Sequence, residues 1–156
     1  MKRHTRNVFL LVIIFFYFGT INSFSQCKLL AKRQCFPALT PYIHNGQLNS
    51  VKLSPGGTAD LQMTFYSGQS YRLMICAEGV LGDVNFRVID TDKKEVFYSK
   101  RADKKDDIIE LAKYWDFKIE STQQLIVEVE VPLSKSPNKL IPDGCVSIIV
   151  GFKGSK

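Results

Sequence analysis

The side chains of this sequence most able to do chemistry are four cysteines, one histidine and several carboxylates. The cysteines are Cys27, Cys35, Cys76 and Cys145. They could form two disulfides or contribute to a metal site. Past the first 25 residues the chain has no CxxC pair and a single histidine, His44. This composition disfavours zinc, so disulfides are the favoured interpretation, and no metal or other cofactor is expected.

Three pairings of the four cysteines are possible, and we expect Cys76–Cys145. Both residues lie on the less apolar face of a predicted strand, so their parity allows a bond across strands. Cys27 and Cys35 would then be left to pair with each other. A continuous helix would place them roughly 12 Å apart, beyond the reach of a disulfide. Either this stretch is not helical throughout, or these two cysteines bond elsewhere.

A catalytic Ser-His-Asp or Cys-His arrangement would have to use His44. This histidine stands in a turn-like stretch, YIHNG, and no nucleophile motif such as GxSxG accompanies it. Asp83, Asp116, Glu128 and Glu130 could be paired carboxylates for glycoside hydrolysis. Glu128 and Glu130 share one face of a strand, however, which is typical of a solvent-facing sheet. A structural or surface role is therefore favoured for His44 and the carboxylates.

A calcium loop is a further possibility, since Asp90, Asp92 and Glu95 offer oxygen ligands close together. Lys93 and Lys94 interrupt this run, and the glycine of a calcium-binding hand is missing. We therefore expect a solvated hairpin turn at this position.

The candidate binding surface consists of Tyr66, Arg72, Tyr98 and Tyr114. The tyrosines lie at strand ends or opposite the main apolar stripe, and Arg72 faces away from the predicted core. Exposed tyrosines on a sheet can form a platform for a sugar or a peptide. They can equally cover sheet edges, so the sequence does not choose a ligand.

Residues 1–25 are typical of a secretory signal peptide. Residues 1–7 carry three basic and no acidic side chains, residues 8–18 are unbroken apolar sequence, and small residues lead to cleavage after Ser25. The apolar run has 11 residues, whereas a membrane span needs about 20. A retained anchor is the weaker alternative. Lipidation of Cys27 is disfavoured because Gln26 and Phe24 replace the small and aliphatic residues expected before it. We expect export to the periplasm or beyond, with no stable membrane span after cleavage.

The formal charge of the whole chain is +6, and loss of residues 1–25 leaves 18 basic and 15 acidic residues, a charge of +3. This balance gives no argument for nucleic acid or an anionic membrane as a partner. The remaining 131 residues suffice for one domain with a real core.

The chain divides at residue 48. Residues 26–47 are irregular or helical: KLLAKRQ (28–34) favours a short helix, and Pro37 and Pro41 end it. Residues 48–156 alternate apolar and polar side chains in eight or nine short strands with frequent turn signals, which predicts an all-β antiparallel sandwich or jelly roll. Residues 64–76, TFYSGQSYRLMIC, are predicted to be its central hairpin, turning at residues 67–69.

Five stretches, PYIHNGQLNS (41–50), TFYSGQSYRLMIC (64–76), LGDVNFRVIDTD (81–92), WDFKIESTQQLIVEVEVP (115–132) and GCVSIIVGFK (144–153), resemble a group of small exported proteins of unknown function from Bacteroidota-type bacteria. This resemblance implies export and a common fold, without an activity or site residues. More loosely, residues 68–71 and 90–94 are similar to jelly-roll accessory domains of the pre-peptidase C-terminal type. These domains bind or position partners and are not catalytic.

The favoured hypothesis is an exported, non-catalytic binding or envelope accessory module whose partner is a protein or a glycan of the cell envelope. A carbohydrate-binding module and a small secreted hydrolase are the alternatives.

Overall fold

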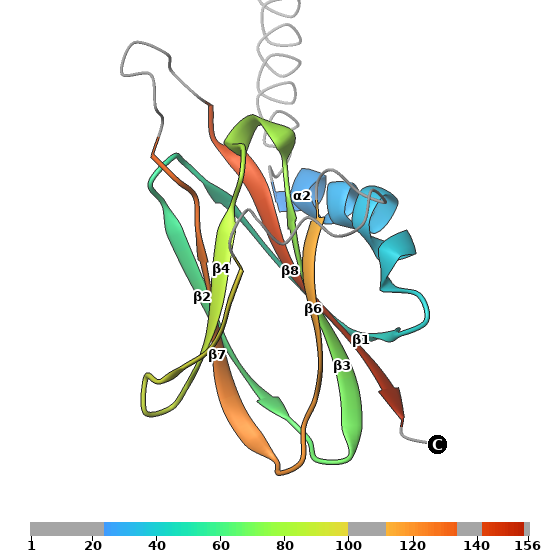
Figure 1. Cartoon of the computed structure of the whole chain (residues 1–156). Helices are drawn as coiled ribbons and strands as arrows, with labels where there is room; N and C mark the ends of the chain where they lie inside the picture. The colour runs from blue at the N-terminus through green and yellow to red at the C-terminus, as the bar shows by residue number, and fades with distance from the viewer. Residues whose placement is uncertain (1–23, 100–111, 134–141, 155–156) are drawn as a thin grey trace, which may run out of the picture.

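The protein folds into two four-stranded antiparallel sheets with a helical segment on one side, as a computed structural model shows (Figure 1). The structure describes residues 24–99, 112–133 and 142–154. The strands are β1 (Ile43–Leu53), β2 (Thr58–Phe65), β3 (Gln69–Ala77), β4 (Asn85–Asp90), β5 (Glu95–Ser99), β6 (Ala112–Lys118), β7 (Gln123–Glu130) and β8 (Gly144–Gly154). Sheet A has the order β1-β8-β3-β6 and sheet B the order β2-β7-β4-β5. The predicted β-sandwich is confirmed.

The main core lies between the inner faces of the two sheets. Phe65, Tyr71, Leu73 and Ile75, which the alternating pattern assigns to the core, are all buried. They pack against apolar side chains of β4, β7 and β8 in one cluster. Full burial of one such side chain stabilises a fold by about 1.5–3 kcal/mol. The period-two pattern therefore identified the inner face correctly.

The predicted central hairpin at residues 64–76 is wrong, because its two strands belong to different sheets. β2 pairs with β7 in sheet B, and β3 pairs with β6 and β8 in sheet A. The turn between them is a corner, where Gly68 has a φ of 75° and donates its N–H to the carbonyl of Ile119. In a corner, as in a hairpin, the apolar sides of both strands face the same core. Alternation alone could not separate the two arrangements.

The first strand begins at Ile43 and not at residue 48. Its register against β8 shifts between His44 and Leu48, and Gly46 within this irregularity has a φ of 87°. Such a bulge breaks the period-two pattern, which hid the start of the strand. The predicted hairpin of β4 and β5 is confirmed, and its turn is held by Asp90, whose Oδ1 accepts the N–H groups of Asp92 and Lys94 at 2.9 and 2.8 Å.

A helical segment, residues 24–39, covers part of the outer face of sheet A. It consists of α2 (Phe24–Leu30), a π-helical turn (Ala31–Cys35) and a 3₁₀ turn (Phe36–Leu39). Helix α2 packs on β1 and β8, and the segment lies beside sheet A, away from sheet B (Figure 1). Within residues 24–99, 112–133 and 142–154, no helix is long and apolar enough to span a membrane.

The helical segment and sheet A enclose a second, smaller core. Ala31, Cys35 and Leu39 pack there against Met74, Cys76 and Ile149 of the sheet. Strands β3 and β8 are consequently buried on both faces over most of their length. The short helix predicted at residues 28–34 is confirmed, but it is part of a longer helical stretch.

Some predictions fall on residues outside the described part of the chain. The proposed signal peptide lies almost entirely there, and the predicted cleavage position after Ser25 falls in the first turn of α2. From the sequence we also expect a mixed-charge loop at residues 100–107, a short edge strand at residues 108–111 and a loop at residues 134–144. The first two lie outside the described residues, as does most of the third.

Candidate functional site

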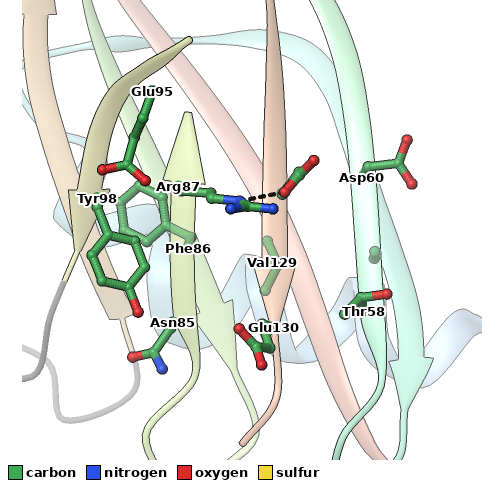
Figure 2. A pocket seen from close by; sticks show the side chains of 11 residues that line it. Thr58, Asp60, Asn85, Phe86, Arg87, Glu95, Tyr98, Val129 and Glu130 are labelled. Atoms are coloured by element: carbon green, nitrogen blue, oxygen red, sulfur yellow. Dashed lines mark hydrogen bonds and ion pairs between the residues drawn. The ribbon is translucent and has the colours of Figure 1, made fainter. Parts of the chain in front are cut away.

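The outer face of sheet B carries an open groove that crosses all four of its strands (Figure 2). The groove has a volume of about 450 Å³. Its floor and walls are Thr58, Ala59, Asp60, Asn85, Phe86, Arg87, Glu95, Tyr98, Glu128, Val129 and Glu130. The strand registers explain this gathering, because Asp60, Glu128, Arg87 and Tyr98 stand in one row across the sheet. Residues far apart in sequence therefore share one surface.

The groove carries negative charge. It holds four carboxylates, from Asp60, Glu95, Glu128 and Glu130, against the single guanidinium of Arg87. The Arg87 Nε–H donates to Glu128 Oε2 across neighbouring strands, as the dashed line in Figure 2 shows. This hydrogen bond chiefly raises the pKa of Arg87, and the charges of Glu128, Glu95 and Glu130 raise it further. Each of these groups favours a cation at this position.

The four cysteines are oxidised as predicted, but the expected pairing is wrong. The bonds are Cys27–Cys145 and Cys35–Cys76, with Cα–Cα distances of 5.2 and 6.2 Å. Helical backbone runs through residues 27–35, which separates the first two cysteines. In sheet A, Cys76 stands opposite Ser147, and Cys145 lies two residues before Ser147, near the start of β8. Parity placed Cys76 and Cys145 on one face correctly but could not supply this register.

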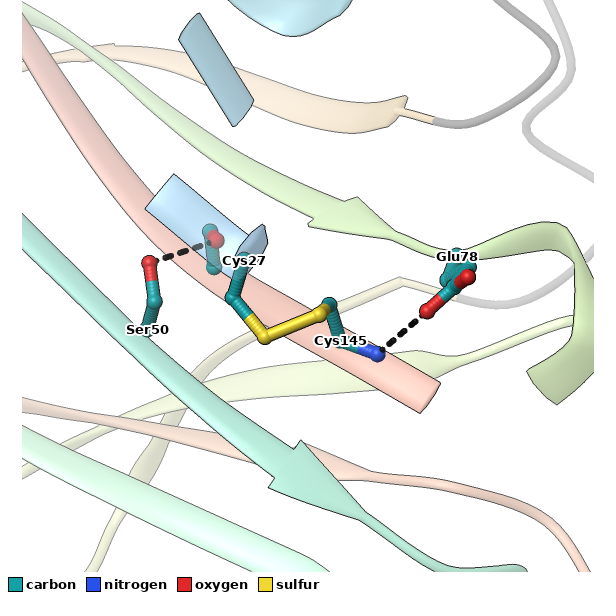
Figure 3. The surroundings of a disulfide bond; sticks show 5 residues. Cys27, Ser50, Glu78 and Cys145 are labelled. Atoms are coloured by element: carbon teal, nitrogen blue, oxygen red, sulfur yellow. Dashed lines mark hydrogen bonds between the residues drawn. A yellow bond between two sulfur atoms is a disulfide. The ribbon is translucent and has the colours of Figure 1, made fainter. Parts of the chain in front are cut away.

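The Cys27–Cys145 bond attaches the start of the helical segment to the start of β8 (Figure 3). The bond is buried, and the backbone N–H of Cys145 donates to Glu78 Oε2 at 3.0 Å. Beside it, the hydroxyls of Ser50 and Ser147 are 2.8 Å apart. The second disulfide ties the middle of the same segment to β3. Both bonds therefore hold the helical segment against sheet A.

A glycine allows the helical segment to approach sheet A closely. A Cβ atom at Gly151 would lie 2.5 Å from Leu39 Cδ2 and 2.8 Å from Tyr42 Cβ. Real Cβ contacts are not this short, so any side chain at residue 151 would push this part of the chain outward.

Arg72 completes the attachment of this segment. Its guanidinium donates to both carboxylate oxygens of Asp116, each at 2.7 Å. Its Nη1 donates to the carbonyls of Ala38 at 2.7 Å and Thr40 at 3.2 Å. The side-chain hydrogen bond to Asp116 is the main cause of the raised pKa of Arg72. With this many donors engaged, Arg72 joins β3, β6 and the end of the helical segment.

Two tyrosine rings accompany this guanidinium. Its central carbon lies 4.8 Å from the ring centroid of Tyr42 and 4.4 Å from that of Tyr114, within the range of cation–π interactions. Burial is the main cause of the raised pKa of Tyr42, followed by the charge of Asp116. Arg72 and its neighbours thus form a compact clamp, which we call the Arg72 clamp (Tyr42, Arg72, Tyr114 and Asp116).

The predicted binding residues do not form one surface. Arg72 and Tyr114 belong to the Arg72 clamp on sheet A, whereas Tyr98 lines the groove on sheet B. Tyr66, 59% exposed, stands at the corner between β2 and β3, where its backbone N–H donates to the hydroxyl of Tyr71. Of the four residues, Tyr98 is the one that the groove includes.

The residues named for a hydrolase are also dispersed. Asp116 belongs to the Arg72 clamp, Asp83 lies 3.6 Å from Lys113 Nζ, and Glu128 and Glu130 lie in the groove. His44 packs against Phe36, with ring centroids 4.5 Å apart, and its Nδ1 accepts the N–H of Gly46. The histidine and these carboxylates thus come together in no single site.

The described part of the chain holds no group of three or more histidine, cysteine or acidic side chains placed to bind a metal. In the suspected calcium loop, Asp90 instead holds its own hairpin turn through backbone N–H groups.

The side of the molecule opposite the groove carries positive charge. We call it the basic face and define it by six exposed side chains: Lys28, Lys32, Arg33, Lys52, Lys118 and Lys153. The first three lie on the helical segment; the others lie on β1, β6 and β8 of sheet A. Register places Lys52 opposite Cys145, and Lys118 and Lys153 beside Ser70. The nearby carboxylates of Asp116 and Glu78 are engaged with Arg72 and the Cys145 N–H.

Sequence reasoning missed the Arg72 clamp and the separation of charge between the two faces. The Arg72–Asp116 pair depends on the register of β3 and β6, which no local pattern supplies. The basic face did leave a signal, because Asp60 is the first acidic residue of the chain. The net charge of the whole chain sums both faces, so it does not show this asymmetry.

Comparisons with known proteins include a distant likeness to a solved structure. No family model matches the chain, and no curated protein sequence matches it. Among solved structures it is similar to Aeromonas hydrophila PliG, a periplasmic lysozyme inhibitor of g-type lysozyme, with 12% identity and a TM-score of 0.44. The match covers 69% of this chain and 85% of PliG. A likeness this low carries no functional argument, and the resemblance to a Bacteroidota-type family stays a prediction.

Proposed function

We propose that the protein is an exported, non-catalytic binding module that holds a partner protein in the groove of sheet B. The observation that carries this proposal is the groove itself, a polar hollow of about 450 Å³ across four strands. Two buried disulfides support an exported protein, since such bonds persist in oxidising compartments.

The outer face of sheet A is a poorer candidate for the same role. Its centre is occupied by the helical segment, which two disulfides hold in place. Arg72, its most versatile donor, is engaged with Asp116 and two backbone carbonyls. A partner at this position would have to displace contacts that the fold already makes.

The chemistry of the groove favours a cationic side chain of the partner. Glu95 and Glu130 contribute carboxylates beside the Arg87–Glu128 pair, and Tyr98 adds an aromatic ring (Figure 2). A lysine or arginine entering the groove would find both carboxylate acceptors and a ring face. An extended protein segment is long enough to cross several strands, which suits a groove open at the surface.

Affinity capture from envelope extracts tests this proposal. The bait is compared with two variants, Tyr98→Ala in the groove and Tyr114→Ala on sheet A. We expect a partner that wild type and Tyr114→Ala both recover and that Tyr98→Ala loses. Recovery by all three baits, or by none above background, would contradict a binding role for the groove.

A glycan partner is the second candidate, favoured by the position of Tyr98 near Asn85 at one end of the groove (Figure 2). An aromatic ring with an amide group close by can stack on a sugar and bind its hydroxyls. A glycan array probed with wild type and Tyr98→Ala separates the candidates. Binding that depends on Tyr98 would replace the protein partner by a sugar, whereas an empty array leaves the protein partner as the proposal.

A further inference from the structure

We propose that the basic face docks the protein on an anionic lipid bilayer. Six exposed cations gather there: Lys28, Lys32, Arg33, Lys52, Lys118 and Lys153. Residues 24–59, which provide four of them, contain no acidic residue. Anionic headgroups attract basic side chains within about a Debye length of the membrane, so clustered cations add their contributions. This inference is independent of what the groove binds.

The layout of the cations suits a broad planar surface. They are distributed over the helical segment and three strands of sheet A, and they do not converge on one cavity. The side chain of Leu29, which is 47% exposed, stands beside Lys28. An apolar side chain among cations on a helix can enter the boundary between headgroups and acyl chains.

The sequence before the basic face also points to a membrane as the occupant. Residues 8–18 are unbroken apolar sequence, and Lys28, the first cation of the basic face, follows ten residues after that run ends. If residues 1–25 act as the expected export signal, the cations at residues 28, 32 and 33 follow directly after it in sequence.

Docking through the basic face would orient the molecule. The groove lies on the outer face of sheet B, on the other side of the sandwich core from sheet A and its helical segment (Figure 1). The groove has four carboxylates and one guanidinium, so its net charge is negative, and repulsion from the anionic headgroups would keep it facing away from the bilayer. The basic face would then contact the membrane, while the groove of sheet B stays accessible to solvent.

Vesicle co-sedimentation tests the proposal on protein recovered after export by an expression host, with its N-terminus fixed by mass spectrometry. Vesicles containing phosphatidylglycerol are compared with vesicles of phosphatidylcholine alone, at low and high salt. The test variant is Lys32→Gln/Arg33→Gln. The control is Lys93→Gln/Lys94→Gln, which removes the same charge from the exposed β4–β5 turn.

We expect binding to the anionic vesicles only, with weakening at high salt. Each basic residue at an anionic membrane is worth about a fivefold change in affinity, so the test variant should bind about 25-fold more weakly. The control should change binding by less than about twofold, because its lysines lie away from the surface.

Several outcomes would overturn the proposal. Equal loss in both variants would show that only net charge matters. Binding that ignores salt and both double substitutions would point to a retained apolar N-terminus instead. A wild type that binds the soluble polyanion heparin but not the anionic vesicles would identify a different class of partner.

Discussion

The two outer faces of this sandwich differ in how the chain uses them. Part of sheet A is covered by the helical segment. Disulfides fasten this segment to β8 and β3, and the Arg72 clamp holds its end. Sheet B is hollowed into a polar groove whose carboxylates face solvent. The contrast teaches that alternating strands with one polar face in sequence can lead either to a second core under a helical segment or to an open polar groove. Removing a contact that holds the helical segment on sheet A should therefore lower the free energy of unfolding. Matched substitutions away from that segment serve as controls.

The largest effect is expected for Cys27→Ala/Cys145→Ala. This bond closes a loop with a sequence separation of 118 residues, for which the loop-entropy relation gives about 5 kcal/mol of stability. Denaturant unfolding measures the loss. The double variant Cys35→Ala/Cys76→Ala, with a separation of 41 residues, should lose about 4 kcal/mol. A negligible change in either variant would show that its disulfide does not fasten the segment.

Gly151→Val should come next, with a loss of about 3 kcal/mol, because its side chain would overlap Leu39 and Tyr42. The matched variant is Gly154→Val in the same strand, where a Cβ atom meets nothing within 4 Å. Thermal unfolding of the two proteins compares them directly. Equal transitions would mean that the helical segment does not pack against β8 as described.

Arg72→Lys should lower stability by about 2 kcal/mol, because a lysine cannot reproduce the paired bonds to Asp116 together with those to the Ala38 and Thr40 carbonyls. Hydrogen exchange should also increase in the helical segment. Arg87→Lys makes the same change at the exposed pair of sheet B and should leave that exchange unaltered. Similar exchange in both variants would contradict the clamp.

The smallest effect concerns alkaline pH. Burial, aided by the charge of Asp116, raises the pKa of Tyr42 above its ordinary value of 10.0. The unfolded chain therefore releases this proton first, and stability present below pH 10 is lost as the pH rises through the folded pKa. Tyr42→Phe should remove that part of the pH dependence in chemical denaturation series. An unchanged slope above pH 10 would assign the dependence to other groups.

Local patterns predicted the parts of this fold that depend on neighbours in sequence. Alternation assigned Phe65 and Leu73 to the core, and the polar stretch around Asp90 marked the one predicted hairpin that the structure confirms. Sequence also indicated that the cysteines are oxidised, since four thiols without metal spacing in an exported chain favour disulfides.

Long-range arrangements escaped prediction for a physical reason. Whether β2 pairs with β3 or with β7, and whether Cys76 meets Cys35 or Cys145, depends on packing between segments distant in sequence. The groove likewise needs the order β2-β7-β4-β5, in which only β4 and β5 are consecutive. Tyr98 was identified as an aromatic at a strand end, but its carboxylate neighbours come from other strands.

The most direct test of the central claim, that two disulfides fasten the helical segment over sheet A, is tryptic peptide mapping under non-reducing conditions. Lys28, Lys32 and Arg33 lie between the first two cysteines, so digestion separates Cys27 from Cys35. We predict linked peptides that join Cys27 to Cys145 and Cys35 to Cys76. Peptides that join Cys27 to Cys35 and Cys76 to Cys145 would contradict it.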